Sequence, residues 1–413
     1  MKTYLRRSLL ADGADTNRRP WPRGKALRPS WALGIALAAI LSIYRVVPAW
    51  GYPQWQLSTG AARCNQCHYA PAGGGLLTSY GRDAVGDQLS TFGGNGAFLH
   101  GAVPVPSWLA VGGDLRGAFV DHAVQDPNGA TVAVFPMQAD ASARLSIPGT
   151  GLSGVGTIGL RGQVRDPNLL VPIQNYQPIS TSRLISREHY LMFQPEVIGT
   201  YLRVGRFFAP FGLRVAEHNL YVRRDLGFDQ LRETYNFSAG IVQDSWEAHV
   251  TVFAPDFLRH IGSDEHGAAA YSEFRVAEGT AAIAGQARIA VGPGATRFIF
   301  GAVGKAYLER ARTLFFTEVN LVHQVFDDPG VRARRQAVGA AGVTILPLPS
   351  LPVTLLGERN QIDIGIPDAW TAANVLVNWF PYAHCEAQLV GRLQFPSGGD
   401  VAKTLFFQVH YFL

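Results

Sequence analysis

The sequence has few charged residues and almost no long apolar run. Of its 413 residues, 16% are charged, against roughly 25% in an ordinary soluble domain. A protein that crosses a membrane with several helices needs runs of about 20 apolar residues, and only residues 31–44 approach this length. Low charge without such runs argues against a multi-helix membrane protein. It is typical of a transmembrane β-barrel, in which lipid-facing and lumen-facing residues alternate along each strand.

A basic tract is also missing once the first 49 residues are set aside. Nine of the 36 Lys and Arg residues and two of the 31 acidic residues lie in residues 1–49, which leaves 27 bases against 29 acids. The high sequence pI of about 9.1 therefore comes from the leader. The remainder is nearly neutral, and we expect no nucleic-acid partner.

Residues 1–49 have the pattern of a signal peptide. A basic stretch precedes the apolar run 31–44, and Val47-Pro48-Ala49 offers small residues for cleavage. The alternative is a single membrane anchor, but fourteen apolar residues followed by Arg45 are short for a span. We predict export from the cytoplasm.

Cysteine is scarce, and two of the three cysteines form a motif. Cys64-Asn65-Gln66-Cys67-His68 fits C-x-x-C-H, the attachment motif for c-type haem. Two thiols at this spacing form thioethers with the haem vinyl groups, and the adjacent imidazole becomes the proximal iron ligand. The motif predicts one covalent haem c, held by Cys64 and Cys67, with His68 on the iron.

Other interpretations of the cysteines explain less. A Cys64–Cys67 disulfide leaves His68 without a role, a thioredoxin-like redox pair needs a βαβ context, and a zinc site needs two more ligands. Export favours haem, because c-type haem is attached outside the cytoplasm. Cys385 alternates with Ala387 and Leu389, so we expect it to be a lipid-facing small residue.

The sequence does not identify the sixth haem ligand, because methionine is also scarce. After the leader only Met137 and Met192 remain, both far from the motif. His100 is the nearest downstream imidazole and the candidate distal ligand. Two alternatives stay open: His100 is an ordinary loop histidine, or the sixth position is open.

Residues 50–111 form a small segment rich in glycine and proline, including Gly73-Gly74-Gly75. About 60 residues bury little apolar core and usually need a covalent or metal staple. We expect a monohaem cytochrome c-like segment that depends on the barrel and lies in its lumen or mouth as a plug or cap. A plain flexible connector is the alternative for the glycine run.

Residues 112–413 break into short stretches in which apolar and polar residues alternate. Residues 157–165, 247–252, 315–324 and 385–395 each keep their charged residues on one parity. Such placement indicates a polar lumen and a lipid-facing exterior, because Arg or Lys facing lipid costs about 2–4 kcal/mol. About 300 residues of this kind predict an antiparallel outer-membrane β-barrel of about 16 strands. A soluble β-sandwich alternates too, but it would be unusually large for one domain.

The C-terminus supports the barrel. Leu405, Phe407, Val409, Tyr411 and Leu413 form one apolar face up to the last residue. This resembles the terminal strand of bacterial outer-membrane proteins. Aromatic residues in 207–208, 379–382 and 411–412 are candidates for interfacial belts.

Together these features resemble the fused outer-membrane monohaem cytochrome–porins of iron-oxidising bacteria. The resemblance is carried by the haem motif behind a signal peptide, followed by Pro71 and Tyr80-Gly81-Arg82, and by the porin-like segments 204–212 and 378–382. It implies a location in the outer-membrane lipid. It also implies electron transfer between an extracellular donor, such as ferrous iron, and a periplasmic cytochrome or other carrier.

Two other functions remain open. The first is a porin for solutes or anions in which the haem-bearing segment is a plug. The second is a lumenal haem peroxidase, which requires an open iron position beside an acid–base residue such as His100. Arg332, Arg334 and Arg335 could attract anions, although a solvated extracellular loop explains them as well.

Overall fold

The computed structural model describes residues 53–58, 63–122, 132–161, 184–217, 219–229, 232–257 and 264–413. The predicted signal peptide lies outside the described residues. The chain divides into two compact units, residues 1–46 and residues 47–413, and every described residue belongs to the second. Among the described residues, no helix is long and apolar enough to cross a lipid bilayer.

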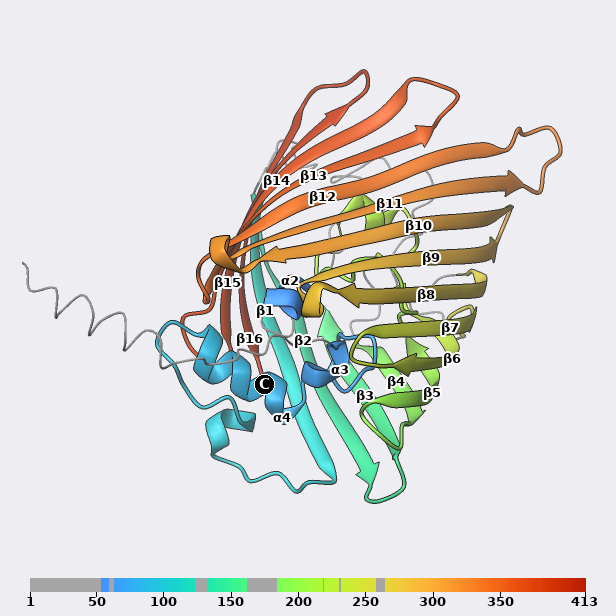
Figure 1. Ribbon diagram of the computed structural model, residues 1–413. Coiled ribbons are helices and arrows are strands. Elements are labelled where there is room, and N and C mark those ends of the chain that lie inside the picture. The colour runs from blue at the N-terminus through green and yellow to red at the C-terminus, as the bar shows by residue number, and fades with distance from the viewer. Residues whose placement is uncertain are drawn as a thin grey trace, which may run out of the picture. The chain divides into compact units, whose positions relative to one another are not determined.

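The second unit is built around a closed antiparallel barrel of sixteen strands (Figure 1), so both the predicted architecture and the predicted strand number are confirmed. The strands are β1 (Leu109–His122), β2 (Val132–Ile147), β3 (Leu152–Arg161), β4 (Leu184–Phe193), β5 (Gly199–Phe207), β6 (Thr234–Val242), β7 (Trp246–Ala254), β8 (His266–Val276), β9 (Ala281–Gly292), β10 (Ala295–Leu308), β11 (Thr313–Phe326), β12 (Arg334–Leu348), β13 (Leu351–Asp363), β14 (Asp368–Trp379), β15 (Cys385–Pro396) and β16 (Ala402–Phe412).

Short helices lie in the N-terminal segment and in the connections between strands. They are α2 (Pro53–Ser58), α3 (Cys64–Cys67), α4 (Ser79–Asp83), η1 (Ala84–Leu89), η2 (Phe98–Gly101), α5 (Tyr221–Arg224), η4 (Ala277–Gly279) and η5 (Glu309–Ala311).

The barrel closes where the first strand pairs with the last. β1 and β16 run antiparallel in register from Asp114 opposite Phe412 to His122 opposite Thr404. Each remaining strand pairs with its neighbours in sequence. Closure leaves no open sheet edge, which is the condition for strands to cross a membrane.

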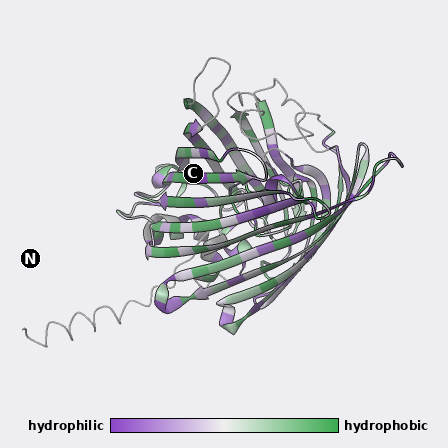
Figure 2. Ribbon diagram, turned by 90° about the horizontal axis from the view of Figure 1, so that it is seen from above, coloured by the Kyte–Doolittle hydropathy of each residue, from purple (hydrophilic) through white to green (hydrophobic). Residues whose placement is uncertain are grey.

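Apolar and polar residues alternate along the strands (Figure 2), as the sequence predicts. On β11, Val319 and Leu321 are 53% and 55% exposed, whereas the intervening Asn320 and the preceding Glu318 are buried. Cys385 lies on the outward parity of β15 with Leu389. A closed barrel with an apolar outside and charged side chains inside is the architecture of an outer-membrane protein.

The two ends of the barrel differ in the length of their connections. At the end where β1 begins and β16 finishes, the strands are joined by two to five residues. At the other end the connections reach 26 residues, in the stretch 208–233. Short periplasmic turns and longer extracellular loops are the usual arrangement in such barrels. We therefore assign the end with short turns to the periplasm.

The long connection 208–233, called here the inner loop, turns into the lumen. The backbone N–H of Leu213 donates to Glu318 on β11 at 2.8 Å, and the N–H of Tyr221 donates to Glu358 on β13 at 2.6 Å. Its apolar residues pack against inward-facing residues of β7 to β14. The loop therefore crosses the barrel interior instead of extending into solvent.

The described residues before β1 fall into two parts. Residues 53–58 and 63–90, called here the lumen segment, contact inward-facing residues of several strands. Residues 91–108, called here the rim strap, follow the periplasmic rim to β1. The barrel begins at Leu109, three residues ahead of the expected boundary at 112.

One sequence prediction about the aromatic belts is wrong. Phe207 is completely buried and packs with Val155, Tyr190 and Met192, and Phe208, the first residue of the inner loop, packs beside Phe228. Both rings therefore lie in the barrel interior. An aromatic pair at a strand end does not by itself show which face it occupies, because the interior partners here come from β3 and β4 for Phe207 and from the inner loop for Phe208.

We predict that Val319→Arg destabilises the barrel by about 2–4 kcal/mol, because it places a charge on the lipid face near the middle of β11. Folding from urea into lipid vesicles, followed by tryptophan fluorescence, measures this loss. Val319→Leu is the matched control and should keep the parent stability. A loss for Val319→Arg no larger than for Val319→Leu would show that this face does not meet lipid.

Candidate functional site

The residues of the C-x-x-C-H motif lie together on one helical turn. α3 places the two thiols three positions apart, and the backbone N–H of His68 donates to the carbonyl of Cys64 at 3.0 Å. His68 then leaves the helix in an extended conformation and pairs with Leu77 in an antiparallel bridge. Cys64, Cys67 and His68 are thus presented by one short, fixed piece of backbone.

Glycine allows the chain to fold back over this turn. Gly73 has a φ of +83°, and a methyl group there would lie 3.3 Å from Cys64 Cβ and 3.8 Å from His68 Cδ2. Gly81, from the Tyr80-Gly81-Arg82 sequence, lies against the carbonyl of Cys67 so closely that a side chain would collide with it. These two positions require glycine for close approach and, at Gly73, for a left-handed backbone.

The side chains of the turn are of the types that covalent attachment of haem c uses. Cys67 is only 1% exposed, and burial raises the pKa of the Cys64 thiol while the nearby Arg214 guanidinium partly lowers it. Two thiols one helical turn apart, followed by an imidazole and covered by glycine, are the donor set that haem c uses. Among the described residues, no group of three or more His, Cys, Asp or Glu side chains converges as a metal site.

A group of five charged side chains faces the lumen segment, and it is called here the lumen charge cluster. Arg214 of the inner loop donates to Glu247 on β7 at 2.8 Å and to the carbonyl of Ala72 at 2.7 Å. One guanidinium therefore joins the inner loop, the barrel wall and the chain beside Gly73. The cluster consists of Arg214, Glu247, Glu273, Arg275 and Lys305.

α2 docks on the same cluster. The Gln56 amide donates to Glu273 at 3.1 Å and accepts from Lys305 at 2.7 Å, and Leu57 packs on Ala282 and Leu314. Glu273 and Lys305 are nearly inaccessible to solvent. Buried charges are tolerated only when they are paired and hydrogen-bonded, and the lumen segment supplies part of that pairing.

Further contacts hold the lumen segment at the periplasmic end. Asn65 donates to the carbonyl of Val197 in the β4–β5 turn at 2.6 Å, and Arg63 pairs with Asp244 in the β6–β7 turn at 3.3 Å. On the opposite side, Arg82 donates to the carbonyl of Val111 on β1. The C-x-x-C-H turn is therefore fixed inside the periplasmic mouth, by strands on both sides of it.

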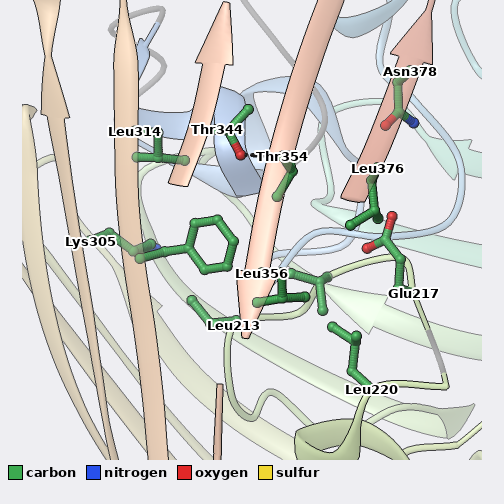
Figure 3. A pocket seen from close by; sticks show the side chains of 12 residues that line it. Leu213, Glu217, Leu220, Lys305, Leu314, Thr344, Thr354, Leu356, Leu376 and Asn378 are labelled. Atoms are coloured by element: carbon green, nitrogen blue, oxygen red, sulfur yellow. Dashed lines mark hydrogen bonds between the residues drawn. The ribbon is translucent and has the colours of Figure 1, made fainter. Parts of the chain in front are cut away.

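Beyond the lumen segment, the inner loop packs apolar side chains into a lumen whose wall also carries buried polar and charged residues, among them Glu318, Glu358 and Arg392. A small cavity lies between the inner loop and the wall from β10 to β14 (Figure 3), where Leu213 and Leu220 face Leu356 and Leu376. Lys305 of the lumen charge cluster also lines the cavity.

His100, the candidate distal ligand, lies at the barrel rim. Its Nε2 is 3.1 Å from the hydroxyl of Tyr411, and its ring meets the edge of the His384 ring with centroids 4.6 Å apart. These contacts are with the end of β16 and the β14–β15 turn. The structure therefore brings Cys64, Cys67 and His68 together and gives His100 other partners; its role as an iron ligand stays a prediction.

Sequence reasoning missed the inner loop and Arg214. The sequence predicts a strand and turn for residues 204–212, and no local pattern indicates that residues 213–229 then enter the lumen. The contact between Arg214 and Glu247 depends on the closed barrel. Only an unusually long connection after β5, visible as a break in alternation, could have indicated it.

We predict that Arg214→Met loosens the lumen segment. Loss of one partner from a buried ion pair costs about 3–5 kcal/mol, and the lower end applies because Glu247 keeps Arg275. Limited proteolysis of the folded barrel in detergent should cleave residues 53–90 faster than in the parent. Arg332→Met is the control: its side chain is 64% exposed in its pair with Asp363, and pairs with an exposed partner at the surface contribute about 0–1 kcal/mol. Equal cleavage rates in both variants would contradict the proposed link.

No protein-family model and no curated protein sequence matches the chain. Solved structures do resemble it. OmpT of Vibrio cholerae has a TM-score of 0.58 at 9% identity, with 75% of this chain and 100% of that chain covered. OprB of Pseudomonas putida has 0.56 at 9%, covering 74% and 94%. The anion-selective porin of Comamonas acidovorans has 0.51 at 10%, covering 74% and 99%. The likeness shows the fold of outer-membrane porins, and with the apolar exterior it locates the chain in the outer membrane.

Proposed function

We propose that the protein is an outer-membrane cytochrome–porin that holds one covalent haem c in its barrel and transfers electrons between an extracellular donor and periplasmic carriers. The observation that carries the proposal is the position of the C-x-x-C-H turn. It lies inside the periplasmic mouth, held by the lumen charge cluster and by the turns around it. The family resemblance in the sequence supports the same function.

In this proposal each residue of the turn has one task. Cys64 and Cys67 would hold the haem through thioethers, and the imidazole of His68 would be the proximal iron ligand. The bound haem supplies one-electron redox chemistry. Gly73 packs closely against Cys64 without a side chain, and Arg214 fixes the backbone at Ala72.

The packed interior favours electron transfer over diffusion of solutes. The inner loop buries Phe211, Leu213 and Leu226 against apolar residues of the facing strands. A channel for hydrated solutes needs a polar, open interior. An electron carrier does not, because electrons tunnel through packed protein. Ferrous iron as the donor is implied by the family resemblance alone.

A second candidate function is a porin for anions with the haem-bearing segment as a plug. The fold likeness to an anion-selective porin supports it. So does the lumen near the extracellular end, where Arg288 and Arg297 both pair with Glu265. Two cations share one carboxylate there, which leaves a positive charge that could attract anions. The rim position of His100 does not favour the third function, a lumenal peroxidase.

We predict that the full chain, produced with a haem-ligation system, carries about one covalent haem. A pyridine haemochrome assay on the denatured protein should give a c-type spectrum. Cys64→Ala with Cys67→Ala should abolish covalent haem, because no thioether can form. Gly73→Val should lower the yield by crowding Cys64.

Cys385→Ser is the matched control for these variants, since Cys385 lies on the outward parity of β15. It should keep the parent haem content. A colourless parent protein, or the same covalent haem content in the double cysteine variant, would rule out the haem site.

We predict that conductance separates the two functions. In planar bilayers the haem-loaded protein should conduct at least about ten-fold less than an open 16-stranded porin. Deleting residues 213–226 of the inner loop should raise the conductance. In intact cells, a membrane-impermeant reductant should reduce the haem. High conductance of the parent protein, with no haem reduction by any impermeant donor, would favour the anion porin.

A further inference from the structure

The rim strap, residues 91–108, is bound to the periplasmic edge of the barrel by its backbone. Thr91 and Phe92 donate to the carbonyls of Phe380 and Pro381 at 2.8 and 2.9 Å, and Ala383 donates back to Gly93 at 3.2 Å. These bonds join the strap to the β14–β15 turn. Gly94 permits the close approach, because a methyl group there would lie 2.9 Å from Ala383 Cβ.

At this point the chain passes from the inside of the barrel to the outside. Leu89, the last residue of η1, is fully buried and packs on Phe380 and on Leu346 of β12. Three residues later, Phe92 is 62% exposed and its ring lies 5.2 Å from that of Tyr382, which is 55% exposed. The rim strap therefore begins where the lumen segment leaves the lumen.

The strap continues along the outer side of the rim. His100 contacts the hydroxyl of Tyr411, which follows Leu405, Phe407 and Val409 on the outward face of β16. The strap then reaches Trp108, 47% exposed, whose carbonyl accepts from the backbone N–H of Ser146 on β2.

The strap also touches the lipid-facing surface directly. Trp379 ends the outward row of β14 and is 41% exposed, and its indole N–H donates to the Thr91 hydroxyl at 3.0 Å. Exposed Trp and Tyr at the ends of barrel strands form the belts that lie among lipid headgroups. Phe92, Trp379 and Tyr382 form one such aromatic patch, to which the strap and the barrel both contribute.

We propose that the rim strap lies in the headgroup layer of the periplasmic leaflet, with Phe92 as its lipid anchor. The occupant of this surface is phospholipid. The patch continues the outward face of β14, which lipid already covers. Residues 91–108 also contain no Asp, Glu, Lys or Arg, so they lack the charges that a docking protein would use for electrostatic recognition. The proposal does not depend on haem or on the direction of electron transfer.

Site-specific photo-crosslinking tests this in the full chain, reconstituted in vesicles of phosphatidylethanolamine and phosphatidylglycerol. p-Benzoylphenylalanine replaces Phe92, and mass spectrometry measures adducts with phospholipid. Val375, on the outward face of β14, serves as the lipid-facing standard, and the exposed Asp83 of α4 serves as the standard facing water. Each variant is first shown to migrate as a folded barrel on unheated gels.

Position 92 should give phospholipid adducts within about two-fold of position 375 and well above position 83, as a residue at the aromatic girdle should. An adduct yield at the level of position 83 would overturn the proposal. So would an adduct with another protein, instead of phospholipid, in intact cells, because the strap would then be a docking surface for that protein.

Discussion

The structure depends on one constraint, that a backbone in lipid must satisfy its hydrogen bonds within the protein. Pairing of β1 with β16 meets it by closing the sheet. Closure also restricts charged side chains to the lumen, because an Arg or Lys on the lipid face costs folding free energy and one in the lumen does not. Glu247, Glu273 and Lys305 therefore point inward and must find partners there. The lumen segment and the inner loop supply some of those partners, so closure of the barrel and docking of the N-terminal segment are parts of one electrostatic arrangement.

The sequence predicts most of the barrel because alternation is a local property. Val319 and Asn320 reveal opposite faces of β11 without knowledge of any other strand, and the strand number follows from length. Phe207 shows the limit of this reasoning. Alternation along β5 gives the parity of Phe207, but its packing partners come from β3 and β4, more than ten residues away. The inner loop is the same case on a larger scale, because Leu213 meets Glu318 only after six further strands have formed.

The candidate site divides in the same way. Cys64, Cys67 and His68 are adjacent in sequence, so their grouping on one turn is local and predictable. Their surroundings are not, because Arg214 and Gln56 reach the turn and the cluster from distant positions. The structure explains two of the glycines near the motif. Gly73 and Gly81 lie where the chain passes closest to Cys64 and Cys67, which their spacing in the sequence does not show. Within the glycine run, for which a flexible connector is the alternative interpretation, Gly73 packs closely against Cys64.

The position of the turn makes the two halves of the barrel unequal. Asn65 and Arg63 bind periplasmic turns, so a haem attached at Cys64 and Cys67 would lie near the periplasm, within reach of a soluble carrier. Most of a hydrocarbon layer about 30 Å thick would then separate it from the cell exterior, and the inner loop occupies that part of the lumen. In the proposed function, the longest electron-transfer step would therefore be on the extracellular side. The residues that set its rate should be those of the inner loop and of the wall facing it, rather than those around the thioethers.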